Sequence, residues 1–180
     1  MHQTLISTSQ LLTFLTDPSW VVVDCRYDLR NKEWGLEQYL AGHIPGAVYA
    51  SLSKDLSGPK TATSGRHPLP APESIANTFG RLGITRDKQV VCYDQDIGMY
   101  AARLWWMLRY LGHAAVAVVD GGFKKWTLEN QKIQSGLKTN PSVTFSSSPQ
   151  QHKLLGTEQI LGSLTGSENL LVDARAPERY

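Results

Sequence analysis

The sequence has little of several features that mark specialised classes of protein. Only two of its 180 residues are cysteines, which excludes a disulfide framework and favours a reducing compartment, so we expect a cytoplasmic protein. The formal net charge of +2 is too small to predict attraction to nucleic acid or to a membrane surface. No apolar run approaches the ~20 residues that span a bilayer, and the first residues lack the basic and apolar parts of a secretory signal.

Motifs for metals and phosphates are missing as well. The five histidines are scattered, and no pair of His or Cys residues has the spacing of a zinc finger, so we expect no metal site. Gly121 and Gly122 follow an expected strand, but the pattern around them is neither Gly-Lys-Ser/Thr nor Gly-x-Gly-x-x-Gly. We therefore expect this glycine pair to allow tight packing between a strand and a helix.

What the sequence does contain is an alternation of apolar runs and amphipathic segments. It predicts buried strands at 20–23, 90–93 and 115–119, and helices at 8–16, 72–82 and 99–111. Continuous runs rich in β-branched residues are typical of parallel strands that are buried on both faces. The expected fold is thus α/β, an open parallel sheet flanked by helices on both faces. Ligands of such sheets bind beyond the carboxyl ends of the strands, so chemistry is expected there.

The chain also contains a partial internal repeat. A displacement of 149 residues aligns Ser7–Arg26 with Gly156–Arg175 without a gap, with eight of twenty positions identical. An apolar pattern explains the matching leucines and valines, but it does not demand Asp-x-Arg after both strands. The polar stretch between the copies has the composition of an interdomain linker. The sequence therefore predicts a domain at 1–136, a linker at 137–153 and the truncated start of a second domain at 154–180.

Four candidate residues lie at the end of the first long strand and in the later turn at 42–47. Asp24 and Arg26 occur in both copies, and we expect them to hold loops in place by hydrogen bonds and ion pairing. Cys25 could be a nucleophile, but Ala174 at its place in the repeat favours a small residue that fills space. His43 could be catalytic, although a turn bounded by glycines and a proline favours a structural histidine.

The loop after the strand at 90–93 has the form of an active-site loop that lacks its nucleophile. Backbone N–H groups between a parallel strand and the next helix point inward and form an anion-binding cradle. A thiolate in such a cradle would be a strong nucleophile, but the first loop residue is Asp94. Cys92 lies within the expected strand and does not take that place.

Together these segments resemble the rhodanese family, and in particular the tandem-domain thiosulfate and 3-mercaptopyruvate sulfurtransferases. The matching motifs, in the family's order, are Val23-Asp24-x-Arg26, Gly42-His43-Ile44-Pro45-Gly46-Ala47, Gly65-Arg66-His67-Pro68-Leu69-Pro70, Val91-Cys92-Tyr93-Asp94, Ala102 to Leu108, and Asp120-Gly121-Gly122-Phe123-x-x-Trp126.

The resemblance implies that the catalytic cysteine, which carries a persulfide, belongs to the carboxyl-terminal domain of the complete protein. Asp94 matches the aspartate that stands at that position in the non-catalytic, amino-terminal domain, so no residue of this chain is expected to be catalytic. Arg179 is the match for an arginine that binds the anionic sulfur donor. The loop with Lys60, Arg66 and His67 is a candidate contact region. The motif residues expected to be structural are Asp24, Arg26, His43, Arg103, Gly121 and Gly122.

The function implied for the complete protein is transfer of sulfane sulfur from thiosulfate or mercaptopyruvate to cyanide or another thiol, without a cofactor. The implied partners are small anionic sulfur donors and the missing second rhodanese domain, and the chain alone is expected to be inactive. Two alternatives remain open: a standalone rhodanese-like interaction module, and activity supplied by Cys25 or Cys92. The repeated half-unit favours the sulfurtransferase over the interaction module, because a standalone module has no use for an extra helix and strand.

Overall fold

The computed structural model of the protein describes residues 1–164 and 170–174. It divides into two compact units, Met1–Pro149 and Gln150–Tyr180. In the described part of the chain, no helix is long and apolar enough to cross a membrane.

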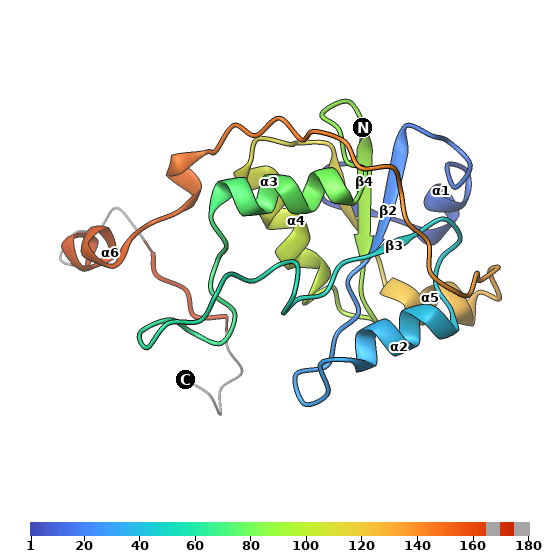
Figure 1. The fold of residues 1–180 in the computed structure, drawn as a ribbon, viewed down its shortest axis with the longest axis horizontal. Coiled ribbons are helices and arrows are strands. Elements are labelled where there is room, and N and C mark those ends of the chain that lie inside the picture. The colour runs from blue at the N-terminus through green and yellow to red at the C-terminus, as the bar shows by residue number, and fades with distance from the viewer. Residues whose placement is uncertain (165–169, 175–180) are drawn as a thin grey trace. The chain divides into compact units, whose positions relative to one another are not determined.

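The first unit is built on a parallel sheet of five strands (Figure 1). The order across the sheet is β1-β5-β4-β2-β3, so that β4 is central and β2 lies beside it. Asp24 pairs in register with Tyr93, which brings the carboxyl ends of β2 and β4 together. The strands are β1 (Leu5–Ile6), β2 (Trp20–Asp24), β3 (Val48–Tyr49), β4 (Gln89–Tyr93) and β5 (Val116–Val119).

Helices cover both faces of this sheet, as the sequence predicts. Figure 1 shows α3 (Pro72–Arg81) and α4 (Ala101–Tyr110) on one side, and α1 (Thr8–Leu12), α2 (Trp34–Ala41) and α5 (Gly122–Leu128) on the other. Side chains alternate along β2: Val21 and Val23 pack into one core cluster, and Val22 packs into the other. The apolar run is therefore buried on both faces, and the expected α/β fold is confirmed.

The ends of the elements follow local chemistry. Pro72 begins α3, and Gly83, with φ of +78°, follows its end, as the glycine and proline positions predict. Helix α1 is shorter than the expected 8–16, because the backbone after Leu12 turns through tighter bonds such as Phe14 N–H to the Leu11 carbonyl. Strand β1 was not predicted, since it is two residues long and only Ile6 of the two is buried.

The polar segment after α5 belongs to the first unit as far as Pro149. The second unit contains a short 3-10 helix, η1 (Gln151–Lys153), and helix α6 (Thr157–Ser163). Residues 170–174 form no strand there, and Leu170, Leu171 and Val172 are exposed.

Candidate functional site

The loop between β4 and α4 closes around the side chain of its first residue, Asp94, which is 2% exposed. Asp94 Oδ1 accepts hydrogen bonds from the backbone N–H groups of Gly98 at 2.9 Å and Asp96 at 3.2 Å. Asp94 Oδ2 accepts from those of Tyr100 at 2.7 Å and Ala101 at 3.2 Å. The last two donors lie at the start of α4, where N–H groups have no partner within the helix. The loop is thus an anion cradle that is filled by the protein's own carboxylate.

Two glycines bring the start of α5 against this loop. Gly121 and Gly122 have φ of +77° and +58°, which favours glycine at both positions. A Cβ at Gly122 would lie 2.7 Å from the carbonyl oxygen of Asp94. That same carbonyl accepts a hydrogen bond from Phe123 N–H at 2.9 Å. The glycine pair therefore permits a close contact between α5 and the Asp94 loop.

Asp24 and Arg26 form a buried ion pair at the carboxyl end of β2. Arg26 Nη2 lies 2.7 Å from Asp24 Oδ2, and Arg26 Nε donates to both oxygens of the carboxylate. The hydroxyl of Tyr93 donates to Asp24 Oδ2 at 2.7 Å. Burial raises the pKa of Asp24, although the charge and hydrogen bonds of Arg26 act in the opposite direction.

This ion pair connects β2 and β4 to the turn before β3. Arg26 Nη2 donates to the carbonyl of Gly42 at 2.6 Å, and the Tyr93 hydroxyl accepts from Ile44 N–H at 3.1 Å. The Arg26 guanidinium also lies 4.0 Å from the centre of the Phe123 ring, on α5. The sequence predicted the ion pair but missed Tyr93, because a tyrosine that ends an apolar run resembles an ordinary core residue.

His43 is fully buried in that same turn. Its Nδ1 lies 2.8 Å from the carbonyl oxygen of Tyr39, so this nitrogen carries a proton and donates it to the carbonyl. The His43 ring stacks on the Tyr39 ring at 4.2 Å, and its main chain forms an antiparallel bridge with Gln134. Among the described residues, His43 Nε2 is the buried side-chain nitrogen or oxygen that has no hydrogen-bond partner. A ring without exposed surface cannot reach a substrate, which favours the structural interpretation.

Arg103 of α4 holds the long loop between β3 and α3. Its Nη2 donates to the carbonyls of Leu56 at 3.0 Å, His67 at 3.2 Å and Pro68 at 3.0 Å. Burial lowers the pKa of Arg103. The side chain therefore acts as a clamp on both ends of the loop.

The clamped loop brings positive charge to the carboxyl edge of the sheet. His67 packs edge-on against Tyr27, with 6.0 Å between the ring centres. Burial lowers the pKa of His67, and the positive charges of Lys60, Arg66, Arg103 and Lys32 lower it further. Lys60 and Arg66 are exposed, so two cations are accessible to an anion at this edge.

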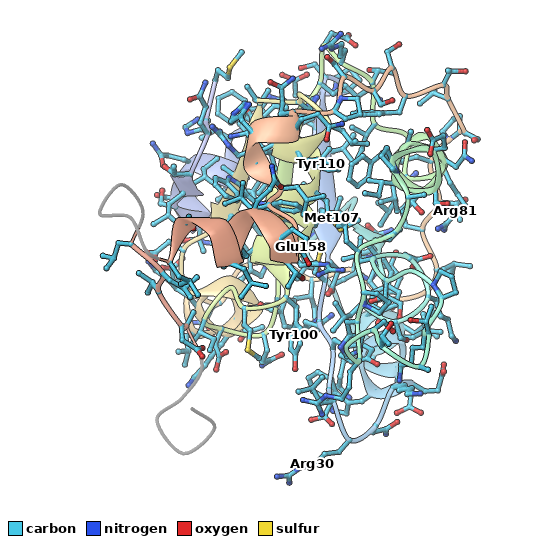
Figure 2. All side chains as sticks on the ribbon, turned by 90° about the vertical axis from the view of Figure 1, so that its left-hand side faces the viewer. Arg30, Arg81, Tyr100, Met107, Tyr110 and Glu158 are labelled. Carbon is cyan, nitrogen blue, oxygen red and sulfur yellow. The ribbon has the colours of Figure 1, made fainter. Side chains whose placement is uncertain are left out.

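A search of protein families agrees with these motifs: the model of the rhodanese-like domain matches residues 7–129. This chain belongs to the rhodanese family. Figure 2 shows the α4 face of the rhodanese domain, with Tyr100 at the start of the helix and Met107 and Tyr110 farther along it.

The relatives of this rhodanese domain include enzymes from bacteria and animals. The chain is 35% identical over 178 residues to a probable 3-mercaptopyruvate sulfurtransferase of Pseudomonas aeruginosa, and the match covers 98% of this chain and 63% of that protein. It is 31% identical over 188 residues to thiosulfate sulfurtransferase of Bos taurus, covering all of this chain and 62% of that protein. The crystal structure of SseA from Escherichia coli, described as a 3-mercaptopyruvate sulfotransferase, superimposes with a TM-score of 0.87 at 28% identity, over 99% of this chain and 68% of that one. The chain thus spans about 63% of the length of the curated relatives it matches.

Both cysteines of the rhodanese domain lie in its core. Cys25 is 1% exposed and Cys92 is fully buried. Burial raises the pKa of both thiols. Because the thiolate is the nucleophilic form, neither residue is placed or ionised for attack on a substrate.

Two further expectations concern the donor-binding arginine and the absence of a metal site. Arg179 lies outside the described residues. Within residues 1–164 and 170–174, no three His, Cys, Asp or Glu side chains come together in a group that could hold a metal ion.

Proposed function

We propose that this rhodanese domain is the non-catalytic half of a two-domain sulfurtransferase. Such an enzyme moves sulfane sulfur from thiosulfate or 3-mercaptopyruvate to cyanide or a thiol. The observation that carries the proposal is the Asp94 carboxylate, which occupies the cradle where sulfur transfer would need a thiol. The names of the curated relatives support the same class of activity.

In the complete protein, the proposed chemistry is a double displacement on a cysteine that this chain does not contain. Its thiolate attacks the outer sulfur of thiosulfate, the S–S bond breaks, and sulfite leaves with the electron pair. Cyanide then attacks the outer sulfur of the persulfide, so that thiocyanate forms and the thiolate is restored. Neither step needs a metal or an organic cofactor.

The second unit supports the proposal that a second rhodanese domain begins there. Helix α6 starts at Thr157, the position that the 149-residue displacement assigns to Thr8, where α1 starts. Gln159 accepts a hydrogen bond from Gly156 N–H, as Gln10 accepts one from Ser7 N–H.

The apolar residues that follow α6 support the same proposal. Leu170, Leu171 and Val172 are 90%, 67% and 72% exposed, and they align with Val21 to Val23 of β2. In the first unit, β2 is flanked in the sheet by β3 on one side and β4 on the other. A segment with this sequence is stable as a strand when it has such neighbours, which the rest of a second domain would supply.

We propose that the carboxyl edge of the first unit faces the active site of the second domain. On the Asp94 loop, Ile97 and Met99 are 80% and 56% exposed, which suits contact with another apolar surface. The exposed cations Lys60 and Arg66 would attract anionic donors toward the shared cleft. Arg179 aligns with Arg30, which is exposed and extends from the tip of its loop in Figure 2.

The test compares this chain with the proposed longer protein, in which a second rhodanese domain with a cysteine-bearing loop follows. With thiosulfate and cyanide, we expect thiocyanate from the longer protein and none from residues 1–180. Activity of the shorter chain that is lost in Cys25→Ser or Cys92→Ser would overturn the proposal.

The role of the loop has its own test in the longer protein. Arg66→Ala should raise KM for thiosulfate severalfold, because one accessible cation is lost. Arg86→Ala, a change to an exposed arginine between α3 and β4, is the matched control and should leave KM unchanged. Equal KM values for the two variants would contradict the proposed contact.

The second candidate function is an interaction module that binds a protein partner without any chemistry. The exposed Ile97 and Met99 on a rigid loop favour it, because they suit any apolar partner surface. It predicts partner binding that Ile97→Asp abolishes, with no sulfur transfer by any longer form of the protein.

A further inference from the structure

The polar segment near the end of the first unit is held against the rest of that unit along its length. We call residues 137–148 the strap. Lys138 N–H donates to the Tyr39 hydroxyl at 3.0 Å, and Asn140 Nδ2 donates to the Leu82 carbonyl at 2.9 Å.

The later half of the strap is held in the same way. Val143 N–H donates to the Gly80 carbonyl at 3.0 Å, and Ser148 N–H donates to the Leu111 carbonyl at 2.9 Å. Between these bonds, Phe145 is buried at 6% exposure. The attachment points at 138, 140, 143, 145 and 148 are two or three residues apart, which leaves no long free stretch.

The surface that receives the strap is shaped for it. A Cβ at Gly80 would collide with the carbonyl oxygen of Val143. Gly83 has φ of +78°, and a Cβ there would lie 2.6 Å from Cβ of Asn140. Two glycines at the end of α3 thus allow the backbone of the strap to approach closely.

Phe145 supplies the apolar anchor of the strap. Its ring packs edge-on against Phe79 of α3, with 5.2 Å between ring centres, and lies 6.1 Å from the ring of His113. An aromatic side chain buried between two elements fixes the chain that carries it much more firmly than solvent-exposed polar contacts do.

We propose that the strap is a rigid arm that fixes the point from which the second unit departs, and that Gly80, Asn140 and Phe145 are positioning residues for sulfur transfer. The part about sulfur transfer rests on the proposed function. A free linker of the same length would have an end-to-end distance of roughly 20 Å with a broad distribution. Docking removes this freedom and raises the fraction of molecules in which two domains meet in one orientation.

The docking is tested on the 180-residue chain by amide hydrogen exchange. The N–H groups of Val143 and Ser148 should be protected, and Gly80→Ala should speed their exchange at least tenfold. Gly65→Ala is the matched control, since a Cβ at Gly65 meets no atom within 4 Å. Rapid exchange of both amides in the unchanged chain would overturn the docking.

The positioning is tested by spin labels at Arg86→Cys in the first unit and Lys153→Cys in η1, because both native cysteines are buried. A narrow distance distribution that broadens in Gly80→Ala supports the proposal, and one that is broad from the start overturns it. This readout does not depend on any enzyme activity.

The consequence for catalysis is tested in the longer, two-domain protein. Phe145→Ala should lower kcat/KM for thiosulfate at least fivefold at a temperature where both variants are folded, and Phe145→Leu should restore most of it. A broadened distance distribution with unchanged kcat/KM would overturn the positioning role. A two-domain protein without any sulfur transfer would overturn the proposed function, while exchange and label distances still decide whether the strap is a rigid arm.

Discussion

Removal of the Asp94 carboxylate should expose how much the filled cradle contributes to the stability of the rhodanese domain. In Asp94→Ala, four backbone N–H groups lose their acceptor at once, at 2.7–3.2 Å from the oxygens that are deleted. A hydrogen bond to a charged group contributes about 1.5–3 kcal/mol, and such contributions are not additive. Water can reach some of the vacated donors, so we expect a loss of about 3–5 kcal/mol in the free energy of unfolding. Asp94→Asn keeps one acceptor oxygen and should lose about half as much.

The assay is urea unfolding, followed by circular dichroism, in chloride and in sulfate at equal ionic strength. The cradle that Asp94→Ala vacates is an oxyanion site at the start of a helix, so sulfate or thiosulfate should partly restore stability. An anion at ten times its dissociation constant adds about 1.4 kcal/mol. Sulfate also stabilises folded proteins in general. The gain in unfolding free energy of the unchanged chain measures this general effect and is subtracted from the gain of the variant.

Two results would refute this reasoning. One is a loss below about 1 kcal/mol in Asp94→Ala, since it would mean that the four donors find equivalent partners elsewhere. The other is an equal gain from sulfate in the variant and in the unchanged chain. Asp120→Ala is the matched control: this exposed aspartate, also at the end of a strand, is paired with Lys125 at the surface and should matter little.

Three further predictions concern the buried ion pair, the arginine that clamps the long loop, and one buried histidine. Arg26→Leu leaves Asp24 buried without its counter-charge and should cost about 3–5 kcal/mol in urea unfolding; a cost near zero would contradict the buried ion pair. Arg103→Lys cannot reach three carbonyls and should speed trypsin cleavage within 52–71 severalfold, and an unchanged cleavage rate would speak against the clamp. Burial lowers the pKa of His113, so it remains neutral in the folded protein at a pH where the unfolded chain takes up a proton. Stability should therefore fall as pH drops below about 6.5. His113→Gln should reduce that fall, and an identical pH dependence would exclude this histidine as its source.

The sequence was sufficient for the architecture because the strands carry their own signal. The buried runs at β2, β4 and β5 are apolar on both faces, so their type and parallel direction follow from composition alone. Strand β1 had no such signal. It is held by pairing of Leu5 and Ile6 with β5, which depends on the rest of the sheet.

The sequence singled out the loop that carries the candidate site, but it did not predict the hydrogen bonds within that loop. The position of Asp94 after a strand predicts a cradle, whereas the four donors depend on how residues 95–101 fold back over it. The pair of Asp24 and Arg26 was expected because it recurs. The hydrogen bond from the Tyr93 hydroxyl to Asp24 follows from strand register, which no single segment encodes.

The strap shows most clearly why composition is a weak guide to such segments. Ser, Pro, Gln and Asn indicate a linker because their side chains do not build a core. Here the attachment is made mainly by backbone groups and by one aromatic ring, that of Phe145. The partner glycine, Gly80, is noticed only when the strap is in contact with it.

The filled cradle explains how the proposed non-catalytic domain would keep the shape of an active-site loop without performing chemistry. Four inward-pointing N–H groups are costly to bury unless an acceptor is present, so a cradle that waits for substrate is stable only while water or an anion fills it. Asp94 supplies that acceptor permanently. The four hydrogen bonds hold the loop around this carboxylate, with Ile97 and Met99 exposed. A surface that does not have to open for a ligand is well suited to fit the proposed second domain, and this is the physical reason to expect a positioning role for the domain in the proposed two-domain enzyme.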